Sequence, residues 1–454
     1  MIACLAFLIP LGLYLSFPSC FWNFDGVACA AALELGQPTY FFHANHLLYG
    51  FLGFLFWKGI GLPLGLTRAL PALQLFTSLL SCLGLVGLYR LILPVLENRW
   101  SALLLTSTLS VTAAFWVWSI EAQVYALGFL ALAWATYTLI QSQSQHKYWQ
   151  VGLLHGAAVL GHLMHFLWAL PALFWIATEC RRLRISTGKP ISQYLGSLAA
   201  ATIIPYVLVV GFVIAPGRDL HRVAVWLKGS AGLTPDRHWA WHSGGWSGPW
   251  VWLKSTGPAL WGSFWPYGNT IVAPWIWIAT SISIILAAAL FVRGWRERRN
   301  ALYLFSALWL GVYGLFLSTW EAGTLCYRMT DILPLGILFA LGLKTWRAPL
   351  QILIGSTLLA STMAVNLSTR ILPMHQMEQN SAYQDTLTLS KITPSNSLYV
   401  ADNSLSWLYI LYFTGRTAWS VHSFDPMRLE TEINREKHNR PVYIQKGSQW
   451  QPLP

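Results

Sequence analysis

Apolar runs long enough to cross a membrane, separated by short polar or basic segments, make up most of the chain. The runs at 195–215, 271–292 and 350–367 each reach the roughly 20 residues that a helix needs to cross about 30 Å of hydrocarbon. We therefore expect each of them to be a spanning helix. The pattern predicts an all-α, polytopic membrane protein.

The same pattern predicts the order of the crossings. The run at 150–178 is long for one helix, yet the basic residues that flank it, Lys147 and Arg181, are expected on the same side of the membrane. We interpret it as two short helices that turn near 161–165, with one long tilted helix as the alternative. This gives about 11 transmembrane helices, at 1–18, 69–94, 101–118, 122–141, the pair within 150–178, 195–216, 269–291, 300–318, 330–343 and 350–368.

The segment 47–66 is apolar enough to span, but its repeated glycines and Pro63 make a poor spanning helix without support from neighbours. We place it along the external interface, within a long first external loop at 19–68. A second external loop is predicted at 217–268. The transmembrane domain then covers 1–368, and an external tail covers 369–454.

The tail is polar and charged. Strand-like patches at 397–400 and 441–444 lie on either side of a predicted helix near 405–413. These features indicate a small α/β appendage.

The composition is typical of a membrane protein, and the distribution of charge argues against a protein that binds nucleic acid. Hydrophobic residues make up 55% of the chain and charged residues 10%, against roughly 25% charged in soluble domains. The net charge of +12 would suit nucleic acid, but many basic residues lie in short blocks between apolar runs, at 181–184, 293–299 and 344–347. Such blocks face the cytoplasm, so we expect membrane lipids and no nucleic acid as partners.

The N-terminus and the cysteines add little chemistry. The run at 1–17 has no basic leading region, so we interpret it as a retained helix rather than a cleaved signal peptide. The six cysteines show neither a metal-ligand spacing nor a paired framework. Cys20 and Cys29 could pair across a short loop, but we favour unpaired cysteines.

Two acidic residues in apolar surroundings are candidates for catalysis. Asp25 follows the first helix and precedes a short helical run that ends at Leu35. It could act as a general base, because such surroundings disfavour an unpaired carboxylate, or it could be a helix N-cap. Glu121 lies in a tight turn between two apolar runs, where an acid usually has a functional partner; the alternative is an interfacial side chain that reaches water.

Four histidines and a tyrosine lie on the external face in this topology. His43 and His46, like His162 and His165, are three residues apart and would share one face of a helix. Two ligands per helix without an acidic or cysteine partner do not make a zinc site, so we predict no metal. We favour phosphate donors, with ordinary polar packing as the alternative. Tyr125 closes the tight turn on this face.

External basic residues break the positive-inside trend and indicate an anionic partner. Arginine suits phosphate because its donors form a planar fork. Anchoring at the membrane interface explains most of the tryptophans interleaved with these residues. The candidates are Arg218, Arg222, Arg237 and His238 in the second external loop, and Glu321 and Arg328 in the turn at 319–330.

These stretches together resemble the GT-C superfamily of membrane glycosyltransferases, closest to its protein O-mannosyltransferase-like branch. The matching segments are 24–49, 118–127 and 152–171, and 320–334 is similar to a later motif of that branch. The resemblance covers roughly the first 180 residues well and the remainder by architecture alone. It implies a GT-C-like bundle with a long first external loop.

The resemblance also implies a function. Such enzymes move a sugar from a polyprenyl-phosphate donor to an acceptor protein, lipid or glycan at the external face of the cell (inner) membrane, generally with inversion and without a cofactor. By position, Asp25 is implied to deprotonate the acceptor hydroxyl, and Glu121 to be the second acid of the site. The chain departs from the family in its His-Ala-Asn run at 43–45, where relatives commonly have His-Pro-Pro, and in having His162 and His165 where many have Lys or Asn.

The alternative function is a transporter or lipid flippase for lipid-linked or anionic substrates. A transporter places charges near the midplane in broken helices and often shows an internal repeat. We find no convincing repeat, and the charges lie at the external ends of the helices. A non-catalytic scaffold would not need the collected acids, histidines and arginines, so sugar transfer is the leading hypothesis.

Overall fold

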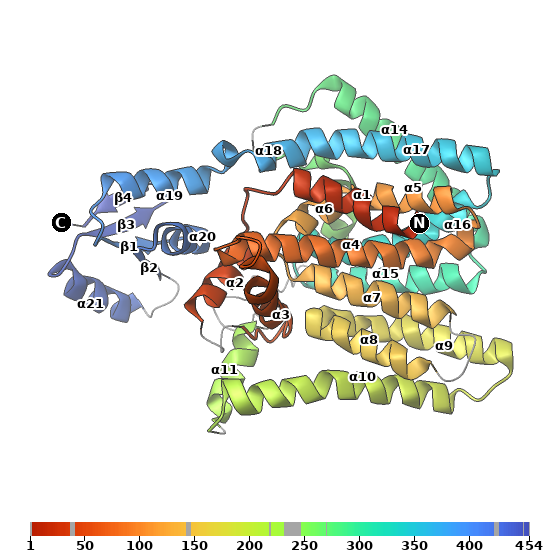
Figure 1. Cartoon of the computed structure of the whole chain (residues 1–454), viewed down its shortest axis with the longest axis horizontal. Helices are drawn as coiled ribbons and strands as arrows, with labels where there is room; N and C mark the ends of the chain where they lie inside the picture. The colour runs from red at the N-terminus through yellow and green to blue at the C-terminus, as the bar shows by residue number, and fades with distance from the viewer. Residues whose placement is uncertain are drawn as a thin grey trace.

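A bundle of helices, most of which run along one common direction, forms the body of the protein (Figure 1). The computed structural model describes residues 2–36, 41–141, 147–217, 219–230, 247–268, 270–421, 426–447 and 449–453. The bundle helices are α1 (Ile2–Ser16), α4 (Ala69–Leu96), α5 (Arg99–Ser110), α6 (Ala113–Ile120), α7 (Tyr125–Gln141), α8 (Tyr148–Gly161), α9 (Ala169–Leu183), α10 (Gly188–Val209), α14 (Pro274–Gly294), α15 (Ala301–Thr319), α16 (Ile332–Leu343) and α17 (Ala348–Asn366).

The helical membrane fold is confirmed, but fewer helices are long enough to span than the sequence predicts. Within the described residues, seven helices are long and apolar enough to cross a membrane, or eight if α5 and α6, bent by 70°, form one span. The difference from about 11 arises because α1, α7 and α8 have only 15, 17 and 14 residues. These three run beside the longer helices (Figure 1).

The run at 150–178 is two helices, as predicted. α8 ends at Gly161, and a 3₁₀ turn, η3 (Leu163–Trp168), leads into α9. Glycines let α8 approach α10 closely: a Cβ on Gly152 would lie 2.4 Å from the Tyr194 carbonyl oxygen, and one on Gly156 would lie 2.4 Å from the Ala201 Cβ. Small residues at such interfaces allow the backbones of membrane helices to meet.

Two of the basic blocks meet at one end of the bundle. The Arg293 guanidinium carbon lies 3.5 Å from the centroid of the Trp346 ring, and Lys344 pairs with Glu297 at 3.5 Å. Loops that the sequence places in the cytoplasm are therefore neighbours in space.

Short helices and the appendage gather at the opposite end of the bundle (Figure 1). They include α2 (Phe24–Leu35), the short helix expected after the first crossing. The segment predicted not to span forms α3 (Tyr49–Phe56) and a π-helical turn at Trp57–Gly61, which together are too short to cross. The second external loop contributes α11 (Leu220–Ser230), α12 (Ser247–Lys254) and α13 (Thr256–Leu260).

The last long helix continues beyond 368, through a π-helical turn at Leu367–Ile371 and α18 (Leu372–His375), before the appendage begins. The appendage contains α19 (Ser381–Ile392), α20 (Ser404–Tyr409), α21 (Pro426–Lys437) and a sheet in the order β2-β1-β3-β4. β1 (Leu398–Ala401) and β3 (Val442–Lys446) match the predicted strands. β1 pairs in parallel with β2 (Thr417–Ser420) and β3, and β3 pairs antiparallel with β4 (Gln449–Pro452).

Candidate functional site

Asp25 lies in the first turn of α2 with an exposed side chain. The N-cap of this helix is Asn23, whose side-chain oxygen accepts a hydrogen bond from the Gly26 amide at 3.1 Å. Gln123 donates to the same oxygen at 2.7 Å. The capping role that the sequence left open for Asp25 therefore belongs to Asn23.

Glu121 is fully buried, with 0% of its surface exposed. Its Oε2 accepts hydrogen bonds from the Asn23 backbone amide at 3.2 Å and from the Asn23 side-chain amide at 2.8 Å. Burial raises the pKa of Glu121, and hydrogen bonds from Ser19, Asn23 and Trp22 oppose that shift. The alternative of an interfacial acid that reaches water is wrong, because Glu121 instead holds the residue that caps the Asp25 helix.

The appendage holds the same segment from the other side. Tyr409 donates hydrogen bonds to the Phe21 and Trp22 carbonyl oxygens at 2.7 and 2.6 Å. The Trp22 ring packs against Tyr383 and Phe413, with centroids 4.9 and 4.8 Å apart. Trp22 has φ of 46°, a conformation that is unfavourable for a bulky residue and that persists only where its surroundings impose it.

Aromatic residues from three elements meet beside Asp25. The Tyr125 ring lies 5.2 Å from the His162 ring and 5.3 Å from the Tyr327 ring, and His162 lies 5.8 Å from Tyr327. The Asp25 carboxylate is within electrostatic reach of Tyr125 and Cys326. The structure therefore brings together α2, the start of α7, the turn after α8 and the 3₁₀ helix η8 (Leu325–Asp331).

Glu321 and Tyr327 extend this cluster. Glu321 follows α15 with φ of 44°, an unfavourable backbone conformation for a residue other than glycine. It is within electrostatic reach of Cys326 and Tyr327. Tyr327 was not among the predicted site residues, although it lies in the segment 320–334 that carries part of the family resemblance.

His43 and His46 lie in a tight turn, so the expectation that they share a helix face is wrong. Their rings stack at 4.1 Å, and the His46 amide donates to the His43 carbonyl oxygen at 3.1 Å. The neighbouring Asn45 carbonyl oxygen accepts from the Leu163 amide at 2.7 Å, which joins this turn to the tip of the α8–η3 connection.

The histidines at this tip are neutral near pH 7. Burial, and then the proximity of His43, lowers the pKa of His162 to about 3. Burial and the neighbouring His43 and His162 likewise lower the pKa of His46 well below its usual value. A neutral imidazole offers one N–H donor and one acceptor. These side chains suit hydroxyl groups, or a phosphate bound without a formal ion pair.

His165 is buried behind them. Its Nδ1 lies 3.1 Å from the Tyr313 hydroxyl, and its Nε2 has no hydrogen-bond partner among the described residues. Gly128 leaves room for this ring, because a Cβ there would lie 2.2 Å from the His165 Nε2. His162 and His165 are 6.1 Å apart by ring centroid, so the predicted pair does converge on one region.

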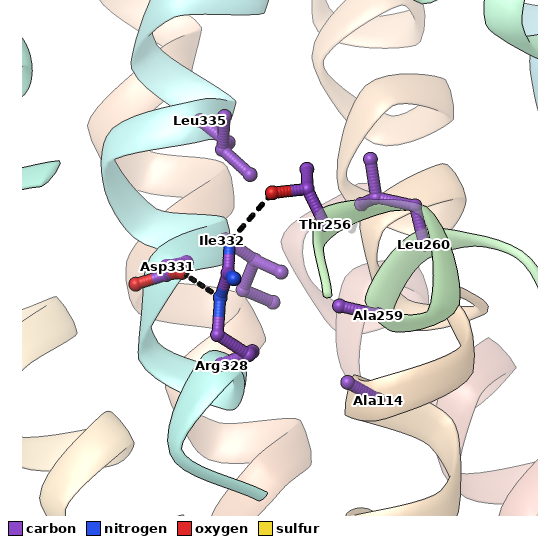
Figure 2. A pocket seen from close by; sticks show the side chains of 8 residues that line it. All are labelled: Ala114, Thr256, Ala259, Leu260, Arg328, Asp331, Ile332 and Leu335. Carbon is purple, nitrogen blue, oxygen red and sulfur yellow. Dashed lines mark hydrogen bonds and ion pairs between the residues drawn. The ribbon is translucent and has the colours of Figure 1, made fainter. Parts of the chain in front are cut away.

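Arg328, a predicted phosphate donor, directs its donors toward other parts of the chain. It is 4% exposed, and its Nε lies 2.5 Å from Asp331. Its other donors reach the Trp252 carbonyl oxygen at 2.7 Å and the hydroxyls of Ser255 and Thr256 at 2.6 and 3.1 Å. Figure 2 shows the bonds to Asp331 and Thr256 beside a cavity of about 10 Å³, which has room for about one water molecule. This geometry favours a structural role in which Arg328 links η8 to the second external loop.

The other predicted cations are dispersed or undescribed. Arg222 is exposed on α11 and pairs with Asp219 at 3.4 Å. Arg218, Arg237 and His238 lie outside the described residues.

Arg370 is a cation that sequence reasoning missed. It is 2% exposed, and its guanidinium carbon lies 3.4 Å from the centroid of the Trp265 ring. No carboxylate of the described chain lies within ion-pair distance, and its Nε has no hydrogen-bond partner there. Glu121 is within electrostatic reach. The sequence signal was a single arginine at the external end of the last apolar run.

All six cysteines are free, as the sequence favoured. Within the described residues, no group of three His, Cys, Asp or Glu side chains is placed to hold a metal ion.

Solved structures share this architecture over nearly the whole chain. The crystal structure of ArnT from Cupriavidus metallidurans bound to undecaprenyl phosphate superimposes with a TM-score of 0.63 at 12% sequence identity, covering 98% of this chain and 92% of ArnT. The protein has a GT-C fold. A second protein of this fold is the oligosaccharyltransferase of Archaeoglobus fulgidus, solved with Zn and sulfate, with a TM-score of 0.50, 14% identity and coverage of 98% and 68%.

The likeness is one of GT-C architecture. No family model matches the sequence, and no curated protein matches it. Sequence identities of 12% and 14% are low enough that the fold carries the comparison, and the site has to be argued from this chain's own residues.

Proposed function

We propose that the chain is a membrane glycosyltransferase that moves a sugar from a polyprenyl-phosphate donor to an acceptor hydroxyl at the external face of the cell membrane. The observation that carries the proposal is the full-length GT-C fold, shared with an ArnT structure that contains undecaprenyl phosphate. The cluster around Asp25, at the end of the bundle opposite the basic loops, supports it. A hexose donor, with a mannose carrier as the first candidate, follows from the resemblance to the O-mannosyltransferase-like branch.

In this proposal Asp25 is the general base. The acceptor oxygen forms a bond to the anomeric carbon of the sugar while the bond from that carbon to the phosphate oxygen breaks. Asp25 takes the proton from the acceptor hydroxyl, and the polyprenyl phosphate leaves with the electron pair of the broken bond. A base must lie within hydrogen-bond reach of the proton it removes, and the exposed carboxylate in the first turn of α2 is accessible to an acceptor.

Glu121 serves as a positioning residue in this scheme. It is buried and accepts two hydrogen bonds from Asn23, so it acts on Asp25 through the cap of α2. Tyr125, His162 and Tyr327 form the wall of the site beside Asp25. Their hydroxyls and neutral imidazole suit the hydroxyls of a sugar.

Arg370 is the proposed contact for the lipid phosphate. A buried guanidinium without an ion pair is costly, and an anionic ligand would compensate its charge. The alternative is that Arg370 only neutralises Glu121 across a longer distance. Arg218, Arg222 and Arg237 remain proposed contacts for the donor as it approaches.

Incubation of the purified protein with a panel of polyprenyl-phosphate sugars tests the function. We expect the protein to consume at least one donor and to release polyprenyl phosphate. Mass spectrometry measures both the donor and the released polyprenyl phosphate. A protein that binds none of the donors and instead moves solutes across liposomes would contradict the proposal in favour of a transporter.

A further inference from the structure

The appendage contains an open cleft of about 380 Å³, lined by residues of α19, of the start of α20 and of the β3–β4 hairpin. This volume is at the lower end of the roughly 300–1,000 Å³ that small-molecule sites occupy. The polar and aromatic residues that line it include Asp385, Thr386, Asn403, Ser406, Gln445 and Trp450.

One buried group in this lining lacks a partner. Gln445 is 7% exposed; its Nε2 donates to the Ser406 hydroxyl at 3.3 Å, while its Oε1 is buried with no hydrogen-bond partner among the described residues. An unsatisfied buried acceptor costs about 1–3 kcal/mol, so such a group points to a ligand or an ordered water.

Two further polar groups are available at the rim. Asp385 is exposed and makes no ion pair or hydrogen bond within the part of the chain that the structure describes. Asn403 uses its side-chain oxygen to cap α20, accepting from the Ser406 amide at 2.8 Å, which leaves its NH₂ group as a donor. Donors and acceptors therefore surround the cleft.

The aromatic and charged side chains that line the cleft indicate which class of ligand it fits. The Trp450 indole is partly buried and is held edge-on against Tyr399, with centroids 5.7 Å apart. Among the described residues that line the cleft, Asp385 is the one with a charged side chain, which disfavours an anion. An indole face beside a carboxylate, amides and hydroxyls suits a neutral pyranose ring, whose C–H face stacks on the indole while its hydroxyls make the hydrogen bonds.

The helices that form the cleft also hold the segment before Asp25. Asn380 caps α19 and donates to the Cys20 carbonyl oxygen at 2.8 Å, and Tyr409 of α20 donates to the Trp22 carbonyl oxygen at 2.6 Å. A ligand in the cleft would contact the same two helices that fix this segment.

We propose that the cleft binds a neutral carbohydrate, namely the part of a glycan acceptor that lies away from the reacting hydroxyl. Its role as an acceptor subsite rests on the proposed glycosyl transfer, whereas carbohydrate binding itself does not.

Saturation-transfer difference NMR on the full chain in detergent tests the binding directly. The probes are methyl α-mannoside, methyl β-glucoside and N-acetylglucosamine. We expect at least one probe to receive saturation from the wild-type protein, and Trp450→Ala and Asp385→Asn each to weaken its affinity at least tenfold. Trp100→Ala removes an exposed indole from α5 and is the matched control, expected to bind as the wild type does.

The outcomes separate the two proposals. Binding that depends on Trp450 and Asp385 supports the cleft even in a protein that transfers no sugar. Donor turnover without probe binding, or binding that neither variant changes, overturns the cleft assignment and leaves the proposed function standing. Asp385→Asn changes an exposed side chain, so it keeps the test decisive if Trp450→Ala fails to fold.

Discussion

At the scale of single residues, the segment that precedes Asp25 is held from both sides. Glu121 binds Asn23 from within the bundle, and Tyr409 binds the Phe21 and Trp22 carbonyl oxygens from the appendage. These contacts impose the unfavourable φ of 46° at Trp22. Pre-organisation of this kind suits the role proposed for Asp25, because misplacement of a catalytic group by about 1 Å can cost roughly 10² in rate.

Asp25→Asn should leave the fold and donor binding close to normal and lower turnover by roughly 10² to 10⁴, the usual contribution of a positioned general base. The helix keeps its cap because Asn23 supplies it, and the lost charge in the first turn costs only about 0.3–1 kcal/mol. Transfer assays and donor titration measure the two effects. Glu430→Gln, which removes an exposed carboxylate from α21 of the appendage, is the control. Near-normal transfer by Asp25→Asn would return Asp25 to a structural role.

Glu121→Gln should retain activity within about tenfold of wild type, because an amide oxygen still accepts the hydrogen bonds from Asn23. Glu121→Ala should lower the thermal stability, since it leaves two buried donors unpaired at about 1–3 kcal/mol each. Parallel activity and unfolding measurements separate the roles. A loss of 10² or more in Glu121→Gln, with stability intact, would make Glu121 a catalytic acid instead.

Arg370→Met should weaken donor binding at least tenfold, because a charge-assisted hydrogen bond contributes about 1.5–3 kcal/mol. Arg181→Ala, at an exposed arginine in the basic block at the end of α9, is the control and should leave donor affinity unchanged. The double variant Arg370→Met with Glu121→Gln distinguishes a phosphate contact from a role in which Arg370 only neutralises Glu121. If Arg370 only neutralises Glu121, removing both charges restores donor affinity; if Arg370 contacts phosphate, the affinity stays low.

At the scale of elements, the sequence pattern predicted the helical membrane fold and several of its local breaks. The break near 161–165, the short helix ending at Leu35 and the strands at 398–401 and 442–446 follow from local signals: glycine, flanking charge and alternation. Contacts between distant elements do not. Three contacts depend on how the helices pack, and no local sequence pattern encodes them. They are the stacking of His43 on His46, the binding of Arg328 to buried partners within the chain, and the contact of Tyr125 with Tyr327.

Gly128 shows how helix packing controls the site. Gly128→Ala should lower stability by about 1–3 kcal/mol, because the new Cβ would lie 2.2 Å from the Nε2 of His165, a side chain that is itself fully buried. Gly196→Ala is the matched control: its Cβ meets nothing within 4 Å, so a neutral or slightly stabilising change is expected. Adding His165→Ala should recover much of the loss in a double-mutant cycle. Equal stability of both glycine variants would show that His165 moves aside freely.

At the scale of the whole molecule, the GT-C bundle holds the basic loops at one end and the candidate site at the other. Two basic loops meet at one end through Arg293, Trp346, Lys344 and Glu297. The short helices, the appendage and the candidate site lie at the other end (Figure 1). The positive-inside rule predicts that the candidate site faces outward, which is the side that the proposed function requires.

Cysteine labelling tests this orientation. In a chain whose exposed Cys4 is replaced, Lys254→Cys should react with a membrane-impermeant maleimide in intact cells, because α12 lies at the end opposite the basic loops and this side chain is exposed. Arg296→Cys, exposed in the basic block after α14, should react only after the membrane is opened. Since the helices of the bundle are continuous, both results must reverse together if the orientation is wrong. Labelling of Arg296→Cys alone in intact cells would place the basic loops outside, and the candidate site would then face the cytoplasm.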